Sequence, residues 1–278
     1  MNRRTASSVP HSEPGLRAKK SLGQHFLSSP TALAKIVEAA HISAGETVLE
    51  IGPGTGILTA AILATGAHVI AVEKDDRAMS LLGARFSKEI STGQLELRCA
   101  DILEEDRASL GLREGGYALV ANIPYYITGA ILESFLEYEP RPDRAVLLVQ
   151  KEVAERIIAR DGRGSLLSIS VKAFGEPRII ATVPRGAFAP PPNVDSAILS
   201  IERVSAARFI GAGVDIRRFF AILKAGFAHK RKKLASNLGE IMDDKEKLTA
   251  AFEKAGIGAS ARAEELSIDQ WTALASAI

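Results

Sequence analysis

The chain has 278 residues, of which 46% are hydrophobic and 24% are charged, values close to those of ordinary globular proteins. This composition excludes a disordered, collagen-like or coiled-coil chain, and the length suits one sizeable domain with a smaller second one. The 35 Lys and Arg residues nearly balance the 33 Asp and Glu residues, so the net charge of +2 identifies no partner. A single cysteine, Cys99, and five scattered histidines argue against a disulfide and a structural zinc site, and we expect no metal.

Residues 1–28 are predicted to form a basic N-terminal arm. Its charged residues are Arg3, Arg4, Glu13, Arg17, Lys19 and Lys20. The first 15 positions are rich in Ser, Pro and Gly, so we expect the start of the arm to be disordered. The arm lacks the apolar segment of a secretory signal, and Gly, Pro and Thr interrupt the longest stretch without acidic or basic residues other than His. We therefore expect a cytoplasmic protein without a membrane span.

Residues 29–205 have the pattern of an α/β domain. Ser29 before Pro30 predicts the start of a first helix. Short apolar runs then alternate with helical patterns, which is typical of a parallel sheet covered by helices on both faces. The predicted strands are Thr47–Ile51, His68–Val72, Gln94–Cys99, Tyr117–Ala121 and Ala145–Val149. The predicted helices between them are Thr55–Thr65, Asp75–Lys88, Thr128–Tyr138 and Lys151–Arg160.

Three further apolar runs, Ser168–Phe174, Arg178–Val183 and Ser196–Val204, are all interpreted as strands. We expect them to close the sheet with an antiparallel edge. From residue 206 to residue 278 the apolar spacing is helical, which predicts a small helical C-terminal domain. This segment is too short to form a large hydrophobic core by itself, so we expect it to pack against the first domain.

A glycine-rich loop follows the first predicted strand and opens a helix. Gly52, Gly54 and Gly56 permit a ligand to approach the backbone closely, and the helix N-terminus favours anionic groups. Glu73 lies 21 residues after Gly52, at the end of the next strand, where a carboxylate can accept hydrogen bonds from both hydroxyls of a ribose. Loop and carboxylate together imply a ligand that carries adenosine.

The spacing of the glycines separates two classes of such ligands. A dinucleotide site has the form Gly-x-Gly-x-x-Gly, whereas here the third glycine comes one residue early and Ile57 follows it. The form Gly-x-Gly-x-Gly is typical of S-adenosylmethionine-dependent methyltransferases, and an NAD-dependent oxidoreductase is the alternative. Asp101, after the third strand, is placed to accept from the adenine amine of the cofactor, although a helix N-cap is an equally good interpretation of this residue alone.

The fourth strand leads into Asn122-Ile123-Pro124-Tyr125 at the edge of the sheet where open α/β folds bind ligands. Pro124 stiffens this turn and removes a backbone donor, which leaves the Asn122 side-chain oxygen and the Ile123 carbonyl as acceptors. Two acceptors can draw the hydrogens of an adenine or cytosine amine out of plane and stabilise the positive charge that develops on its nitrogen. Tyr125 offers a ring on which the target base can stack.

These motifs resemble those of the KsgA family of ribosomal RNA adenine N6,N6-dimethyltransferases over nearly the whole chain that is expected to be ordered, including the end of the arm. Further matching segments are Leu22–Leu27, Phe188–Ser196 and Phe227–Leu238. The resemblance implies a Rossmann-like class I S-adenosylmethionine-dependent methyltransferase fold and a cofactor site of His25, Leu27, Gly52, Gly54, Gly56, Glu73, Asp101 and Asn122. It also implies that Phe188 forms a second aromatic wall of the target-base pocket beside the catalytic residues Asn122 and Tyr125, although core packing is the commoner fate of such a Phe.

The resemblance implies methylation of two adjacent adenosines near the 3′ end of 16S rRNA, within a 30S particle or an assembly intermediate. A related branch methylates an adenine of large-subunit rRNA and confers macrolide resistance, but the C-terminal segment resembles the small-subunit branch. A non-catalytic ribosome-assembly factor is the other alternative, and the intact Asn122 and Tyr125 argue against it.

Residues 216–239 hold seven Lys or Arg residues and no Asp or Glu. On a continuous helix Arg217, Lys224 and Arg231 would form one stripe, although Gly226 can interrupt such a helix. The positive charges of such a dense basic cluster repel one another, and a bound polyanion would reduce this repulsion. We therefore predict RNA binding, with a solvent-exposed helix face as the alternative. The predicted RNA-binding residues are Arg217, Lys224, Lys230, Arg231, Lys232 and Lys233.

Overall fold

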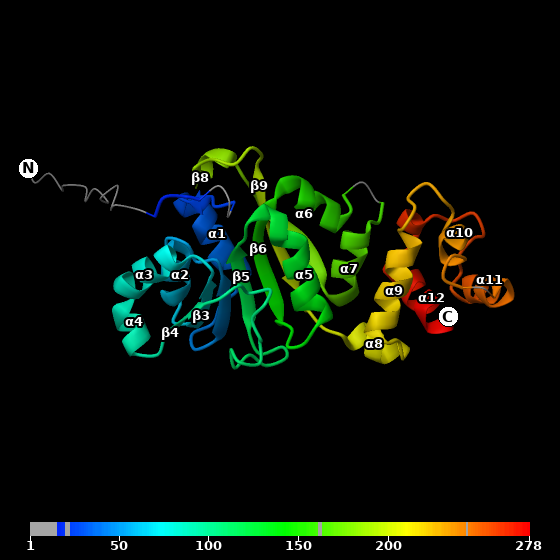
Figure 1. The fold of residues 1–278 in the computed structure, drawn as a ribbon, viewed down its shortest axis with the longest axis horizontal. Helices are drawn as coiled ribbons and strands as arrows, with labels where there is room; N and C mark the ends of the chain where they lie inside the picture. Colours follow the sequence, from blue (N-terminus) through cyan, green and yellow to red (C-terminus); the bar gives the residue numbers. More distant parts are fainter. Residues whose placement is uncertain (1–15, 20–22, 161–162, 243) are drawn as a thin grey trace, which may run out of the picture.

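A computed structural model describes residues 16–19, 23–160, 163–242 and 244–278 of the chain. The predicted disordered start of the arm, with Arg3, Arg4 and Glu13, lies outside these residues, as do Lys20 and Leu22. Figure 1 shows an elongated molecule in which a helix-covered sheet is followed by a group of C-terminal helices.

A mixed seven-stranded sheet forms the centre of the N-terminal part, with the order β4-β3-β2-β5-β6-β9-β7. Its strands are β2 (Thr47–Ile51), β3 (His68–Glu73), β4 (Leu95–Cys99), β5 (Ala118–Asn122), β6 (Arg144–Gln150), β7 (Glu176–Val183) and β9 (Ser196–Glu202). The five strands from β4 to β6 are parallel, and β9 pairs antiparallel with both β6 and β7. The predicted parallel sheet with an antiparallel edge is confirmed.

Helices cover both faces of this sheet, because successive strand residues point to opposite sides. Val48 and Val120 pack in one buried cluster with α1 (Pro30–Ala40), α2 (Ile57–Leu63) and α3 (Asp76–Arg85), which α4 (Ser87–Ser91) follows. Leu49 and Ala121 pack in the other cluster, with α5 (Thr128–Glu137), α6 (Lys151–Ile158) and α7 (Leu166–Phe174). Ser29 caps α1 by accepting from the Ala32 amide, as the Ser-Pro pair predicts.

The prediction of a strand at Ser168–Phe174 is wrong, because this segment forms α7. The segment alternates Ser168, Ser170 and Lys172 with apolar residues, and this period of two is typical of a strand. The local reason for the helix is a capping box, in which the Ser165 hydroxyl accepts from the Ser168 amide and the Ser168 hydroxyl accepts from the Ser165 amide. The buried residues of α7 then pack into the cluster on its face of the sheet.

A short two-stranded sheet joins the start of the described chain to the segment before β9. Phe26–Leu27 forms β1 and pairs antiparallel with β8 (Phe188–Ala189), which the 3-10 turn Arg185–Ala187 precedes. The Ser28 amide also donates to the Ala187 carbonyl at 2.8 Å. This pairing holds the segment around His25 against the edge of the main sheet.

The C-terminal segment is helical, as predicted. Its helices are α8 (Ala207–Ala212), α9 (Ile216–Gly226), α10 (Leu234–Leu238), α11 (Lys245–Lys254) and α12 (Ile268–Ala277). One buried cluster runs from the sheet through α7 into α9 and α12, where Trp271 is fully buried. The division into domains at residues 205 and 206 therefore stays a prediction, since the packing is continuous across it. Among the described residues no helix has the length and apolar character needed to cross a membrane.

Candidate functional site

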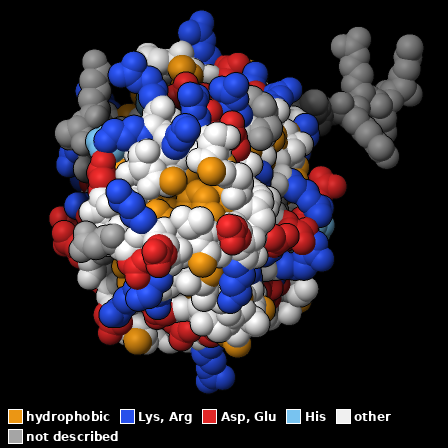
Figure 2. Space-filling model, turned by 90° about the vertical axis from the view of Figure 1, so that its right-hand side faces the viewer, with side chains coloured by type: hydrophobic (Ala, Val, Ile, Leu, Met, Phe, Trp, Pro, Cys, Tyr) orange, Lys and Arg blue, Asp and Glu red, His pale blue; other side chains and the backbone are white. Residues whose placement is uncertain are grey.

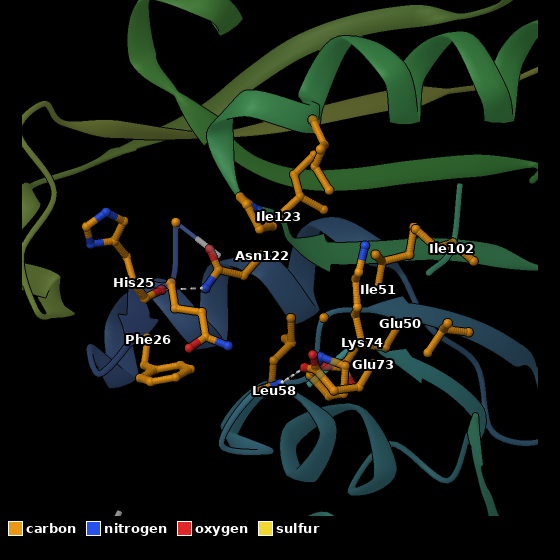
Figure 3. Close-up of a pocket in the computed structure, with 18 of the residues that line it drawn as sticks. His25, Phe26, Glu50, Ile51, Leu58, Glu73, Lys74, Ile102, Asn122 and Ile123 are labelled. Atoms are coloured by element: carbon orange, nitrogen blue, oxygen red, sulfur yellow. Dashed lines mark hydrogen bonds between the residues drawn. The ribbon is translucent and has the colours of Figure 1, made fainter. Parts of the chain in front are cut away.

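A cavity of about 210 Å³ opens at the carboxyl ends of the parallel strands (Figure 3). Residues from the ends of β2, β3 and β5 and from the turn after β4 meet here, because parallel strands end at the same edge of a sheet. The segment around β1 covers one side of the cavity. The predicted site residues that line it are His25, Leu27, Gly52, Gly54, Glu73, Asp101, Asn122 and Tyr125.

The glycine loop bends through left-handed backbone conformations, with φ of 67° at Gly52, 55° at Gly54 and 78° at Gly56. A Cβ on Gly54 would lie 3.0 Å from the Phe26 ring, so the loop and the β1 segment fit together only without a side chain there. A Cβ on Gly56 would lie 2.6 Å from the ring of Phe86. Gly56 is not among the lining residues of the cavity, so its close packing explains this glycine without a ligand.

Glu73 ends β3 and is 7% exposed. Its carboxylate accepts from the Gly54 amide at 3.1 Å and from the Asp75 amide at 2.9 Å. Burial raises the pKa of Glu73, and these backbone donors oppose the rise. The carboxylate therefore ties the glycine loop to the end of the next strand while facing the cavity.

Asp101 lies in the turn after β4, at the same opening, and its carboxylate has partners within the protein. Its Oδ2 is 2.6 Å from Lys74 Nζ, and its Oδ1 accepts from the Leu103 amide at 3.1 Å. The hydrogen bond from Lys74 lowers the pKa of Asp101, which stays an ionised acceptor. Asp101 thus lines the cavity as predicted and also fixes the following turn. No helix begins there, so the alternative of a helix N-cap is wrong.

Asn122, the last residue of β5, faces the cavity (Figure 3). Its Nδ2 donates to the His25 carbonyl at 3.1 Å. An amide that donates through its nitrogen presents its oxygen on the other side. The bond therefore selects the orientation of the Asn122 side chain and attaches the β1 segment to the strand end.

The aromatic groups at the cavity differ in burial. The Tyr125 hydroxyl forms a 2.7 Å hydrogen bond with the Ser196 hydroxyl, and burial raises the pKa of Tyr125. The ring stacked on Tyr125 is that of His25, with centroids 5.9 Å apart, while His25 Nδ1 lies 2.8 Å from the Pro190 carbonyl. Phe188 is 4% exposed in the buried cluster and does not line the cavity. Its predicted role as a second wall stays a prediction, and core packing accounts for it here.

Sequence patterns did not assign several of the residues that line the cavity, and three of these contribute to its shape or charge. Phe26 covers Gly54, Lys74 pairs with Asp101, and Glu50 lies buried in β2 directly before the glycine loop. A signal existed for Glu50, since a carboxyl inside an otherwise apolar buried strand is unusual. Lys74 carried no signal, because its partner is distant in the sequence. Across the described residues no group of three or more His, Cys, Asp or Glu side chains is placed to hold a metal ion.

The predicted basic stripe is wrong as a continuous helix, because α9 ends at Gly226 and Arg231 lies in the turn before α10. Lys224 pairs with Glu133 at 3.0 Å and Lys232 with Glu240 at 2.9 Å. Arg217 lies on α9, and Lys230, Arg231, Lys232 and Lys233 are all exposed. Figure 2 shows Lys and Arg side chains interspersed with Asp and Glu on the C-terminal end of the molecule, so both signs of charge are present there.

A second, wider groove of about 1000 Å³ lies between α5, α6, α7 and the C-terminal helices. Its basic lining residues are Arg156, Arg160, Arg163, Lys224 and Lys230. Its acidic lining residues are Glu133, Glu137, Glu155 and Glu264. Burial and the neighbouring Glu133 raise the pKa of Glu137 to about 7, so this groove becomes more positive as the pH falls below that value.

The sheet order, the glycine loop and the cavity at the strand ends define a Rossmann-like class I methyltransferase. The model of the ribosomal RNA adenine dimethylase family matches residues 15–278, and the chain belongs to that family. The chain is 42% identical to ribosomal RNA small subunit methyltransferase A of Dehalococcoides mccartyi over 93% of this chain and 88% of the relative.

Two solved structures resemble the whole described molecule. A dimethyladenosine transferase from Plasmodium falciparum has a TM-score of 0.76 and 28% identity, covering 90% of this chain and 96% of that one. The 23S rRNA methyltransferase ErmE has a TM-score of 0.68 and 27% identity, covering 91% of this chain and 98% of that one. Both similarities extend beyond the sheet into the C-terminal helices, since they cover nine tenths of the chain.

Proposed function

We propose that this protein transfers methyl groups from S-adenosylmethionine to N6 of two adjacent adenosines near the 3′ end of 16S rRNA. The observation that carries this proposal is one cavity in which Glu73, the glycine loop and the Asn122-Ile123-Pro124-Tyr125 turn meet. Support also comes from the relative named ribosomal RNA small subunit methyltransferase A. A small-subunit enzyme of this kind would contribute to ribosome biogenesis.

The cavity residues fit the proposed cofactor. The loop of Gly52 and Gly54 leaves backbone accessible, Glu73 is a carboxylate suited to a ribose diol, and Asp101 is an ionised acceptor suited to an adenine amine. Glu50 adds a buried carboxyl without a hydrogen-bond partner, which suits a cationic ligand. His25 and Leu27 would close one side. When bound, S-adenosylmethionine would supply a methyl group activated by a sulfonium charge.

The turn after β5 would perform the chemistry on the adenine. Asn122 offers its side-chain oxygen because its nitrogen is held by His25, and the Ile123 carbonyl offers the second acceptor. Two acceptors on the adenine amine raise its nucleophilicity and stabilise the charge that develops on nitrogen during transfer. A strong general base is unnecessary, because an alkylated ammonium loses its proton readily. Tyr125 would hold the base by stacking, with its hydroxyl fixed by Ser196.

The RNA would dock outside the cavity on basic side chains. Lys230 and Arg231 are exposed in the turn between α9 and α10, and Lys230 also lines the wide groove with Arg156. Phosphate contacts position a protein on a nucleic acid, whereas base contacts select the target. A 30S particle or its assembly intermediate presents folded rRNA of this kind, and we assign it as the partner.

The test is methylation with labelled S-adenosylmethionine and unmethylated small subunits, followed by nucleoside analysis of the RNA. The expected product is N6,N6-dimethyladenosine in two adjacent positions near the 3′ end of 16S rRNA. Unmethylated large subunits are the parallel substrate. Exclusive labelling of 23S rRNA would favour the branch that includes ErmE, and the absence of any labelled nucleoside with cofactor bound would favour a non-catalytic assembly factor.

A further inference from the structure

The carboxyl group of Glu50 is buried at the floor of the cavity. Glu50 lies in β2 directly before the glycine loop, is 1% exposed and lines the cavity (Figure 3). Among the described residues neither of its oxygens has a hydrogen-bond partner. Its register neighbours in the sheet, Ala71 and Val120, are apolar. A carboxyl group in such a place has no internal compensation for a negative charge.

Glu73, another of the three carboxyls that line this cavity, is held differently. It accepts from two backbone amides, so part of its charge is compensated by the protein. The Thr59 hydroxyl faces Glu50 from α2 and partly opposes the effect of burial on the pKa of Glu50, but the two groups are outside hydrogen-bonding geometry. Burial, with a smaller contribution from the charge of Glu73, raises the pKa of Glu50 to about 8. The cavity without a ligand therefore contains one neutral acid at neutral pH.

The Glu50 carboxyl is neutral because no positive charge of the described residues lies beside it, and a cation that binds in the cavity would supply that charge. Opposite charge nearby favours the ionised form of a carboxyl, so the cation replaces the proton as the compensating charge. S-adenosylmethionine carries a sulfonium and an ammonium against one carboxylate, whereas S-adenosylhomocysteine lacks the sulfonium. S-adenosylmethionine therefore carries one more positive charge than S-adenosylhomocysteine.

We propose that Glu50 releases its proton when S-adenosylmethionine binds and takes up a proton again when the cofactor has become S-adenosylhomocysteine. This inference rests on the proposed function of the cavity. In the transfer, the carbon–sulfur bond breaks with its electron pair kept by sulfur, the new nitrogen–carbon bond forms, and the amine proton leaves to water. The proton that returns to Glu50 comes from the solvent. Glu50 thereby makes the cavity prefer the charged cofactor over the spent one.

The experiment is isothermal titration calorimetry of the full chain at pH 7 in buffers with different ionisation enthalpies. A group with a pKa of about 8 is about nine-tenths protonated at pH 7, so release of roughly 0.9 proton per site is expected with S-adenosylmethionine. A clearly smaller release is expected with S-adenosylhomocysteine. Glu50→Gln, which mimics the neutral acid, should abolish the difference between the two ligands.

Thr59→Val is the matched control, because it changes a buried neighbour of Glu50 without removing the carboxyl. This variant should retain the proton release. Across pH 6 to 8, affinity for S-adenosylmethionine should rise with pH in the wild type and more weakly in Glu50→Gln, while Glu73 contributes equally to both. In the infrared difference spectrum of the wild type, the carboxylic-acid carbonyl absorption should also lose the intensity of one protonated carboxyl when S-adenosylmethionine is added, while the contribution of Glu137, outside the cavity, remains.

The outcomes separate this inference from the proposed function. Failure of both ligands to bind would overturn the function of the cavity itself. Binding with the same number of protons released by the wild type and by Glu50→Gln, or the same number for both ligands, would overturn the role of Glu50. If Glu50→Gln does not fold, as judged by circular dichroism, the infrared difference spectrum of the wild type decides, and an unchanged carboxylic-acid absorption with bound S-adenosylmethionine contradicts the proposal.

Discussion

Glu73 joins two structural elements at the cavity, and we expect cofactor binding to depend on its carboxylate. Glu73→Ala removes the acceptor for a ribose diol and also releases the Gly54 amide. Hydrogen bonds to charged groups contribute about 1.5 to 3 kcal/mol each, so affinity for S-adenosylmethionine should fall at least tenfold. Calorimetry on the folded variant checks this, with the exposed Glu104→Ala as control. Unchanged affinity in Glu73→Ala would contradict the assignment.

Asn122 should affect turnover far more than RNA affinity. Its oxygen is expected to act on the amine mainly in the transition state, so Asn122→Ala removes an interaction made when charge develops. Loss of one such group costs about 100- to 1000-fold in rate. Single-turnover methylation at saturating RNA measures this effect, and the exposed Asn193→Ala serves as control. A rate within about twofold of the wild type would refute the role.

Glu50 should also make stability depend on pH in the absence of ligand. The unfolded chain loses this proton near pH 4.5 and the folded chain near pH 8, so the unfolded state binds fewer protons between these values. The free energy of unfolding therefore falls as the pH rises through this window, by about 3 kcal/mol from pH 5 to pH 8. Urea denaturation of Glu50→Gln should lack this component. Identical pH profiles for both proteins would contradict it.

At the scale of elements, the junction of α9 with α12 depends on a missing side chain. A Cβ on Gly226 would lie 2.4 Å from the ring of Trp271 and 2.9 Å from Leu234. Gly226→Ala should therefore destabilise the protein by about 1 to 3 kcal/mol, as overpacking of a core does. Gly83→Ala, within α3 and with open space around it, should be neutral or stabilising by up to about 1 kcal/mol. Urea denaturation of both variants compares the two effects.

The position where α9 ends also determines which basic residues are free to contact RNA. Because α9 ends at Gly226, the basic residues that follow lie in an exposed turn rather than on a helical stripe. Lys224, which lies on α9, forms an ion pair with Glu133. Within the described chain Lys230 and Arg231 form no ion pair, so they are the better candidates for phosphate contacts than the predicted stripe.

For the whole molecule, we predict that docking on a ribosomal particle depends on this turn and leaves the cofactor site unaffected. Lys230→Ala with Arg231→Ala should weaken particle binding and reduce its salt dependence by roughly one counterion per lost contact. Lys245→Ala with Lys254→Ala removes the same charge from α11 and should change the slope less. Filter binding across salt concentrations gives the slopes, and calorimetry gives the cofactor affinity. Equal slopes in the two double variants would place docking elsewhere.

The local patterns of this sequence determined the alternation of strands and helices from β2 to α6 and the main parts of the cavity. Short apolar runs such as β2 and β5, bounded by glycines and prolines, fit few structures other than buried strands. The carboxyl ends of parallel strands lie at the same edge of the sheet. Local pattern and strand order are therefore enough to bring Gly52, Glu73, Asp101 and Asn122 together. Family resemblance supplied His25 and Leu27, which spacing alone does not connect to the site.

Tertiary structure alone decided the features that depend on contacts between distant segments. The segment that forms α7 alternates polar and apolar residues as a strand does, so the capping box and packing, rather than periodicity, selected a helix. Phe188 became core because β8 pairs with β1. The pairing of Lys74 with Asp101 and the isolation of Glu50 are likewise invisible in the sequence, because hydrogen-bond partners and the desolvation of a charge depend on what folding brings near each group.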